Sequence, residues 1–460
     1  MKTFQDLVAV RKNGTENDVM KFCLDVIEDH MSSQAYREAL DAEEYDKQRN
    51  VTINTYQKLL YTMTGKAIPD NYSANWKCAS NFFHRFVVQQ TQYLLGNGIA
   101  FEDETVKKKI GGDRFDRVLK EIGRGSLKAG VCFGFYNLDH VEMFPFLQYA
   151  PLYDEEDGQL KAGVRHWQIA SNKPLRFTLY EVDGFTDYIK EDGKEAKVLH
   201  EKRPYVLKVA VSEDAEEILS GRNYPTFPIV PCYGNNNQSM LVGMRQNIDC
   251  YDLIKSGFAN DVDDASAIYW TLQNAGGMTD LDLAQFVERM KTVKAAVVSE
   301  QEGAKAEAHT VDVPTNAREA LLTRIEADLY RDAMALNVNQ ISGGNITATA
   351  INAAYDPQDG NASDFEDNIC DFVDGILFLA GYDSNTEYTF KRSRIANQLE
   401  ETQMILAAAQ YMDQQTILEH LPFLSADEIE GIIARTTGEE MSRYADADNA
   451  TDEETETEEQ

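Results

Sequence analysis

The chain has 460 residues, of which 43% are apolar, so it is long enough for two to four domains with large buried cores. It carries 44 Lys and Arg residues against 77 Asp and Glu residues, which gives a formal net charge of -33. Because proteins that grip nucleic acid present a basic face to the phosphates, this balance argues against tight DNA binding, although it suits a protein that lets DNA pass without adhesion.

The first part of the chain is predicted to be helical. Residues 1 to about 65 carry apolar residues such as Val19 and Phe22 at helical spacing. A second helix is predicted over NFFHRFVVQQTQYLLG, where Gly96 and Gly98 end it, and a third over RFDRVLKEIGRGSLKAG.

From about Gly130 the pattern changes to short segments of β-branched and aromatic residues separated by turn residues. These segments predict an antiparallel meander, with Asp157-Gly158 as a hairpin turn. The strand segments are VCFGFYNLD, VEMFPFLQYAPLYD, LKAGVRHWQIA, LRFTLYEVDG, FTDYIKEDG and PYVLKVAVS. Pro225, Pro228 and Pro231 follow, and they are expected to break the sheet because proline cannot donate to a ladder.

Two long helices flank a small insert in the second half of the chain. The first helix covers about 239–267, and the second is capped by Asn316 and runs to about Leu336, with Glu319 completing a capping box. The insert, 268–314, mixes strand-like segments with one helix.

A polar loop with a double glycine, NVNQISGGN, follows the second long helix. After it we expect a helix to about Tyr355, a break at DPQDGN, a helix over SDFEDNICDFVDGILFLAGY and a strand over TEYTFKRSR. Three compact helices then lead to an acidic tail, 438–460, which is expected to be disordered.

No pattern in the chain points to an enzyme. The six cysteines lie far apart, and there is no HExxH, no GxSxG and no P-loop. The acidic pair Asp263-Asp264 and the run YDEED could bind a divalent ion, but a solvated acidic face is the simpler interpretation. The first residues lack the apolar core of a signal peptide, and no run approaches the roughly 20 apolar residues of a membrane span, so we expect a soluble protein made in a reducing cytoplasm.

The long helices are amphipathic and carry mixed charges on their other faces, which side-by-side copies in a ring would shield. Several segments resemble, in order, those of phage portal proteins of siphophages that infect Gram-positive hosts. The resemblance covers about residues 20–437. The segments are NFFHRFVVQQTQYLLGNGIAFED, PLYDEEDGQLKAGVRHWQI, FPIVPCYGNNNQSMLVGMRQNIDCYDLIKSGFANDVDDASAIYW and FKRSRIANQLEETQMILAAAQYMDQQTILEHLPFLSADEIEGI.

The resemblance implies an α+β portal-protein fold with an α/β wing, a two-helix stem, a small α/β clip insert and a C-terminal helical crown. Carried over to this chain, the parts are the wing (1–238), stem helix one (239–267), the clip (268–314), stem helix two (315–336), a tunnel loop (337–345), a channel helix with a return to the wing (346–392) and the crown (393–437).

The same resemblance implies which residues act. The tunnel loop would line the DNA channel with Asn337, Asn339, Gln340, Ser342, Gly343, Gly344 and Asn345. Stem contacts between subunits would involve Arg245, Tyr251, Lys255, Arg324 and Arg331. Clip contacts would involve Phe286, Arg289, Lys291 and Lys294.

The implied partners are further copies of the chain in a ring, usually of twelve, double-stranded DNA in the channel, the large terminase, a head-completion adaptor, and the major capsid and scaffolding proteins. No cofactor, metal or membrane is implied, and the protein would be assembled in the host cytoplasm and reside in the virion at a capsid vertex. Two alternatives stay open at this point: another capsid-associated ring, scaffold or adaptor protein, and a metal-dependent hydrolase that uses the acidic clusters.

Overall fold

The computed structural model divides the chain into two compact units. The larger comprises Met1–Leu336 and Pro357–Arg392, and the smaller comprises Asn337–Asp356 and Ser393–Gln460. The described residues are 2–61, 65–70, 74–211, 216–265, 269–273, 279, 281, 285, 288, 305–309, 315–338, 348–382, 386–393, 405, 413, 416–418, 432–433 and 435. Helices and sheets are mixed along the chain, so the predicted α+β class is confirmed.

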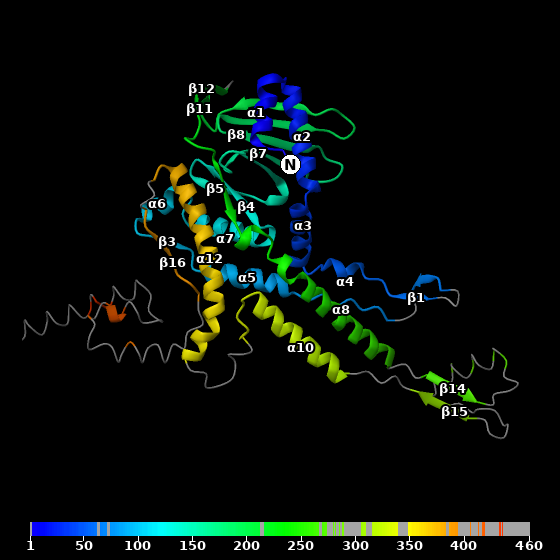
Figure 1. The fold of residues 1–460 in the computed structure, drawn as a ribbon. Coiled ribbons are helices and arrows are strands. Elements are labelled where there is room, and N and C mark those ends of the chain that lie inside the picture. Colours follow the sequence, from blue (N-terminus) through cyan, green and yellow to red (C-terminus); the bar gives the residue numbers. More distant parts are fainter. Residues whose placement is uncertain are drawn as a thin grey trace, which may run out of the picture. The chain divides into compact units, whose positions relative to one another are not determined.

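Two N-terminal helices, α1 (Phe4–Asn13) and α2 (Glu16–Ser32), pack across one face of a five-stranded antiparallel meander (Figure 1). The strands follow chain order in space: β6 (Tyr149–Tyr153), β7 (Leu160–Trp167), β8 (Leu175–Glu181), β9 (Gly184–Lys190) and β10 (Lys197–Arg203). The predicted meander is thus confirmed for β6 to β9, whereas the segments VCFGFYNLD, VEMF and PYVLKVAVS, which were also expected in it, belong to other sheets. Edge strand β10 was not predicted, because its sequence, KVLHEKR, is polar and almost wholly exposed, as an unpaired sheet edge should be.

A second sheet has the order β13 (Ile229–Tyr233), β4 (Val131–Asn137), β5 (His140–Phe144). An aromatic core lies between it and the meander. The expectation that the proline-rich segment breaks the sheet is wrong, because Pro231 pairs with Phe133 from an edge strand, where a missing donor is tolerated. At Gly134 any Cβ would lie 2.5 Å from the ring of Phe372, so the glycine permits a close helix contact.

The largest core joins the other face of that sheet to a layer of helices, including the Pro357–Ala380 part of α12. Phe365, Ile369 and Phe372 are fully buried in it. The helices are α3 (Gln34–Asp46), α4 (Val51–Thr55), α5 (Phe82–Leu95), α6 (Glu104–Lys109), α7 (Asp113–Ala129), α8 (Leu241–Ala265), α10 (Thr315–Asp332) and α12 (Ala348–Ala380), with 3-10 turns at Phe146–Gln148 and Asn235–Asn237. No helix among the described residues is long and apolar enough to cross a bilayer.

Four two-stranded ribbons complete the described strands. They are β1 (Leu59–Tyr61) with β2 (Ala67–Pro69), β3 (Ile99–Phe101) with β16 (Tyr388–Phe390), β11 (Val206–Val211) with β12 (Glu216–Arg222), and β14 (Tyr269–Gln273) with β15 (Lys305–His309). Strand β16 confirms the prediction for TEYTFKRSR. The helical expectation fails after Thr55, where β1 and β2 form a hairpin instead.

Several helix and strand boundaries differ from the sequence expectations. Helix α12 continues through Pro357, so the expected break at DPQDGN is wrong, and the buried face that follows offsets the roughly 3 kcal/mol cost of an internal proline. Helix α10 begins at Thr315, before the expected cap Asn316, and it ends at Asp332 rather than at Leu336. The segment VEMFPFLQYAPLYD forms two strands, because a 3-10 turn follows Pro145.

In the smaller unit, the described residues include a helix start. Asp413 accepts a hydrogen bond from the backbone N–H of Thr416 at 3.0 Å, and 416–418 are helical. This geometry agrees with the helix expected over DQQTILEHLP, because an aspartate N-cap satisfies a first-turn donor.

Two histidines are buried together between α2 and the meander. His30 is 1% exposed and His166 is 6% exposed, and their ring centroids lie 6.2 Å apart. His30 Nε2 lies 2.9 Å from the carbonyl oxygen of Phe146, whereas His30 Nδ1 and His166 Nε2 have no hydrogen-bond partner among the described residues. Burial lowers the pKa of both imidazoles, that of His166 to about 4, and the neighbouring His30 adds to the effect on His166.

Acid should therefore destabilise this part of the fold. The folded-state pKa of His166 lies below its ordinary value of 6.5, so the unfolded chain takes up the proton first and stability falls as the pH drops from about 6.5 to about 4. The expected loss is about 3 kcal/mol. His166→Phe should remove most of this pH dependence in urea unfolding followed by circular dichroism. A variant with the same acid sensitivity as the parent would contradict the assignment.

Candidate functional site

One face of α8 carries polar side chains at every third or fourth position. Residues at this spacing lie above one another on a helix, so they form a continuous stripe. The stripe consists of Arg245, Asp249, Asp252, Ser256, Asn260 and Asp263. Every one of these side chains bonds to the first 80 residues of the chain.

The C-terminal part of the stripe, from Asp252 onward, forms hydrogen bonds with residues 74–80, which we call the strap. The strap runs along α8 in the opposite direction, and the backbone N–H of every second residue points at the helix. The N–H groups of Trp76, Cys78 and Ser80 donate to side-chain oxygens of Asn260 (2.6 Å), Ser256 (2.9 Å) and Asp252 (2.8 Å) respectively.

Asp252 is the most buried member of the stripe, with 0% exposure. One oxygen accepts the Ser80 N–H and the other accepts the amide of Asn50, so both bonded partners are uncharged. Desolvation raises the pKa of this carboxyl, and the hydrogen bonds from Asn50 and Ser80 oppose that rise.

The N-terminal part of the stripe, Arg245 and Asp249, contacts α3 and α4. Asp249 accepts hydrogen bonds from the hydroxyls of Tyr45 and Thr52, the latter at 2.7 Å. Burial and the bond to Asp249 raise the pKa of Tyr45 to about 12. Arg245 donates to Asp41 at 2.6 Å, so its charge is matched within the chain.

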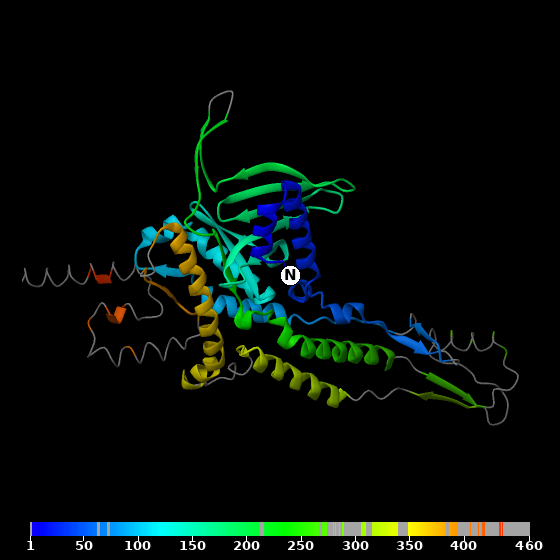
Figure 2. The same cartoon turned by 45° about the horizontal axis from the view of Figure 1, so that its top comes forward.

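Helix α10 packs beside α8 (Figures 1 and 2). Its buried residues begin only at Ile325 and include Leu329 and Tyr330. Polar contacts support both ends of the pair: Arg318 forms an ion pair with Asp261, and Asn247 donates to Asp332 at 3.1 Å.

The C-terminal end of α10 is fixed against α5. Gln89 donates to the carbonyl oxygen of Leu336 at 3.0 Å, and Arg85 donates to the hydroxyl of Tyr330 at 2.6 Å. Met334 has a φ of +49°, and the Ala335 N–H bonds to the carbonyl oxygen of Tyr330, as in a Schellman motif.

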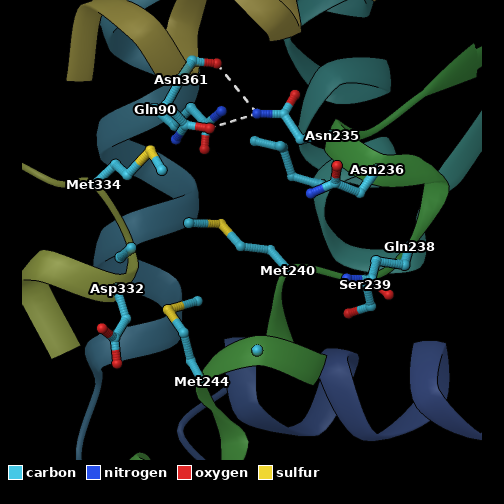
Figure 3. A pocket seen from close by; sticks show the side chains of 13 residues that line it. Gln90, Asn235, Asn236, Gln238, Ser239, Met240, Met244, Asp332, Met334 and Asn361 are labelled. Carbon is cyan, nitrogen blue, oxygen red and sulfur yellow. Dashed lines mark hydrogen bonds between the residues drawn. The ribbon is translucent and has the colours of Figure 1, made fainter. Parts of the chain in front are cut away.

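A cavity of about 180 Å³ lies where α5, α8 and the end of α10 meet (Figure 3). Asn235 donates to the Asn361 side chain and backbone, and Met240, Met244 and Met334 supply apolar wall. Gln90 Nε2 and Asn235 Oδ1 are buried without hydrogen-bond partners in the described part of the chain. The cavity is polar and large enough for ordered water, which would satisfy both groups.

The five predicted stem residues occupy α8 and α10, but their described partners lie in their own chain. Tyr251 packs edge-on against Phe82, and Lys255 lies over the Tyr251 ring at 5.9 Å. Arg324 and Arg331 both pair with Asp328. Their place at contacts between copies stays a prediction.

The other predicted site residues lie mostly outside the described residues. Of the tunnel loop, Asn337 is described. Those outside are Asn339, Gln340, Ser342, Gly343, Gly344 and Asn345 of the loop, and Phe286, Arg289, Lys291 and Lys294 of the insert. The acidic tail also lies outside.

The acidic clusters have structural partners. In YDEED, Asp154 accepts hydrogen bonds from Gln5 at 2.6 Å and from Lys161, which also pairs with Asp157 at 2.7 Å. The hydrogen bond from Lys161 is the main cause that lowers the pKa of Asp154 to about 2. Asp263 accepts from the Trp76 indole at 3.3 Å. Over the described ranges, no three His, Cys, Asp or Glu side chains are arranged to hold a metal ion.

Comparison with known proteins identifies relatives over most of the chain. A family model described as "Phage portal protein, SPP1 Gp6-like" matches residues 38–454. A portal protein of Bacillus phage SPP1 is 25% identical over 430 residues, which are 86% of this chain and 82% of that protein. A portal protein of Clostridium phage phiCD119 is 25% identical over 223 residues, 47% of this chain and only about half, 49%, of its own length.

Solved structures give weaker likenesses. A chain from the neck of a native GTA particle, computed with C12 symmetry, aligns with a TM-score of 0.41 at 11% identity, over 76% of this chain and 91% of that one. A chain from the virion of a native gene transfer agent particle aligns with a TM-score of 0.40 at 10% identity, over 77% and 89%.

Removing the Asp252 carboxylate should cost more stability than removing any exposed member of the stripe. Asp252→Ala leaves the Ser80 N–H buried without an acceptor and leaves the Asn50 amide only its bond to the Ser80 carbonyl oxygen, so we expect a loss of about 3 kcal/mol in denaturant unfolding. Asp263→Ala, an exposed carboxylate on the same stripe, is the matched control and should change stability by about 0.5 kcal/mol or less. Equal losses in both variants would show that the buried bonds do not hold the strap.

Proposed function

The chain belongs to the SPP1 Gp6-like family of phage portal proteins, and on that premise we propose that copies of it close into a ring at one capsid vertex. Viral DNA would enter and leave the capsid through the ring. Family membership over residues 38–454 is the observation that carries this proposal. Portal proteins of this family are structural components of the virion, and the proposed role requires no chemical step by the chain itself.

The proposed parts follow the order of elements. Helices α8 and α10 form the stem, and 268–314 form the clip. Residues 1–238 with the return within 346–392 form the wing, 337–345 the tunnel loop and 393–437 the crown. Three observations support this division: α8 and α10 lie side by side, β14 pairs with β15 within the insert, and the segment that follows α10 is held at Leu336, immediately before the loop.

The charge of the stem suits passage of DNA. Helix α8 has five carboxylates and two basic residues, and α10 has four carboxylates and three basic residues. Arg331 pairs with Asp328 at 2.9 Å and Asp332 at 3.5 Å. A wall whose cations are matched by its own carboxylates releases few counterions from DNA, so adhesion to the phosphates stays weak.

The partners we propose follow from a portal's position. The clip, with Phe286, Arg289, Lys291 and Lys294, would meet the large terminase during packaging and a head-completion adaptor afterwards. The wing would face the major capsid and scaffolding proteins. Energy for packaging would come from the terminase, so the portal would act as a conduit and a docking ring.

Electron microscopy of the purified chain tests the ring directly. We expect closed rings with a central hole wide enough for a DNA duplex, most of them with one subunit number. In a closed ring each subunit contacts two neighbours, so its loss breaks two contacts. We therefore expect the rings to persist on dilution into the micromolar range. A compact monomer under all solution conditions would contradict the proposal.

The tunnel loop is tested by stiffening its double glycine. We expect the combined change Gly343→Pro and Gly344→Pro to leave rings intact and to lower DNA packaging strongly, because proline fixes φ and removes backbone freedom. The matched control replaces both glycines with alanine, a smaller restriction that should lower packaging less. Normal packaging by the proline variant would remove the loop from the mechanism.

A further inference from the structure

Both strands of the β1–β2 ribbon, LLY and AIP, consist of apolar and aromatic residues. In its register Leu59 lies opposite Pro69, and Tyr61 lies opposite Ala67. Side chains alternate along a strand, so these four share a face. Leu59 is 47% exposed, Tyr61 is 72% exposed, and all of β2 is exposed.

Such a ribbon is not stably folded without further contacts. A two-stranded hairpin is marginally stable in water and needs a further surface to cover its apolar face. Within the described residues, the face formed by Leu59, Tyr61, Ala67 and Pro69 stays exposed to solvent. A contiguous exposed apolar face of this kind is typical of a protein contact.

The ribbon and α10 lie on different flanks of α8. In both views α4 and β1 lie on one side of α8, and α10 lies on the other (Figures 1 and 2). The strap fixes the chain after the ribbon to α8 through Trp76 and Cys78. A subunit with complementary surfaces on opposite flanks makes head-to-tail contacts, which close into a ring when the rotation permits.

The N-terminal half of α10 has an exposed surface that includes an apolar side chain. None of residues 315–324 is buried, and Leu321 is 47% exposed.

We propose that the apolar face of the β1–β2 ribbon in one copy packs on the exposed N-terminal half of α10 in the next copy. The inference rests on the proposed ring and assigns one of its contacts. Leu59 and Tyr61 cover Leu321 of the adjacent copy. In this arrangement the β1–β2 ribbon of each subunit packs against α10 of its neighbour, while the strap binds the chain after the ribbon to α8 of its own subunit.

Cross-linking between differently labelled chains tests the contact. In a Cys250→Ser background, which removes the exposed native thiol, one chain carries Tyr61→Cys and a second carries Leu321→Cys. The two are mixed, assembled and oxidised mildly. We expect a disulfide-linked dimer that contains one chain of each kind, and no dimer of comparable yield from either chain alone. A contact within one copy would give no dimer and would overturn the proposal.

Assembly measurements separate this contact from general damage to the ribbon. Tyr61→Asp should raise the concentration at which rings half-form by about tenfold or more, a change of about 1.4 kcal/mol per contact. Ile68→Asp places the same charge on the opposite face of the ribbon and should have a much smaller effect. Equal effects, or rings that are normal in both variants and give no mixed dimer, would overturn the contact while leaving the ring. Absence of rings in the parent chain would refute the proposed function itself.

Discussion

The polar stripe of α8 is the interaction on which the rest of the larger unit depends. Successive donors of an extended chain two residues apart are separated by about 6.7 Å, and successive acceptors four residues apart on a helix by about 6 Å. The near match lets Trp76, Cys78 and Ser80 each find an acceptor on α8. Asp252 anchors this arrangement, because a buried carboxylate that lost its donors would be costly. Helix α8 and the N-terminal region therefore behave as one body.

The sequence revealed elements whose pattern is local. The alternation in the meander, the glycines after α5 and the buried face of α12 all follow from contacts made within or next to the segment. The stripe on α8 was visible as a polar face, but a face that bonds to its own chain has the same composition as one that meets solvent or another copy. Its partners Asn50 and Ser80 lie some two hundred residues earlier and carry no signal of their own.

The errors at boundaries have the same origin. A helix end is recognised from glycine or asparagine, yet α10 turns at Met334 in the left-handed region, held by backbone bonds to Tyr330 and Arg331. Pro357 signals a break, yet α12 continues because burial of its apolar face in the core stabilises a continuous helix. Pro231 signals the end of a sheet, yet an edge strand needs no donor on its open side. In each case tertiary packing outweighed a local preference of a few kcal/mol.

The stripe also determines which groups α8 can present to other molecules. Its N-terminal residues, Arg245 and Asp249, are matched by the N-terminal helices, so α8 offers neither a fixed cation to DNA nor a bare carboxylate to a metal on that side. In the proposed ring, contacts with a neighbouring copy would then involve α10 and the β1–β2 ribbon. Any displacement of α8 carries the strap and the ribbon with it, since Asn260 and Ser256 hold the strap backbone rather than its side chains. A ring built through the ribbon would therefore transmit movement of one stem to the next subunit.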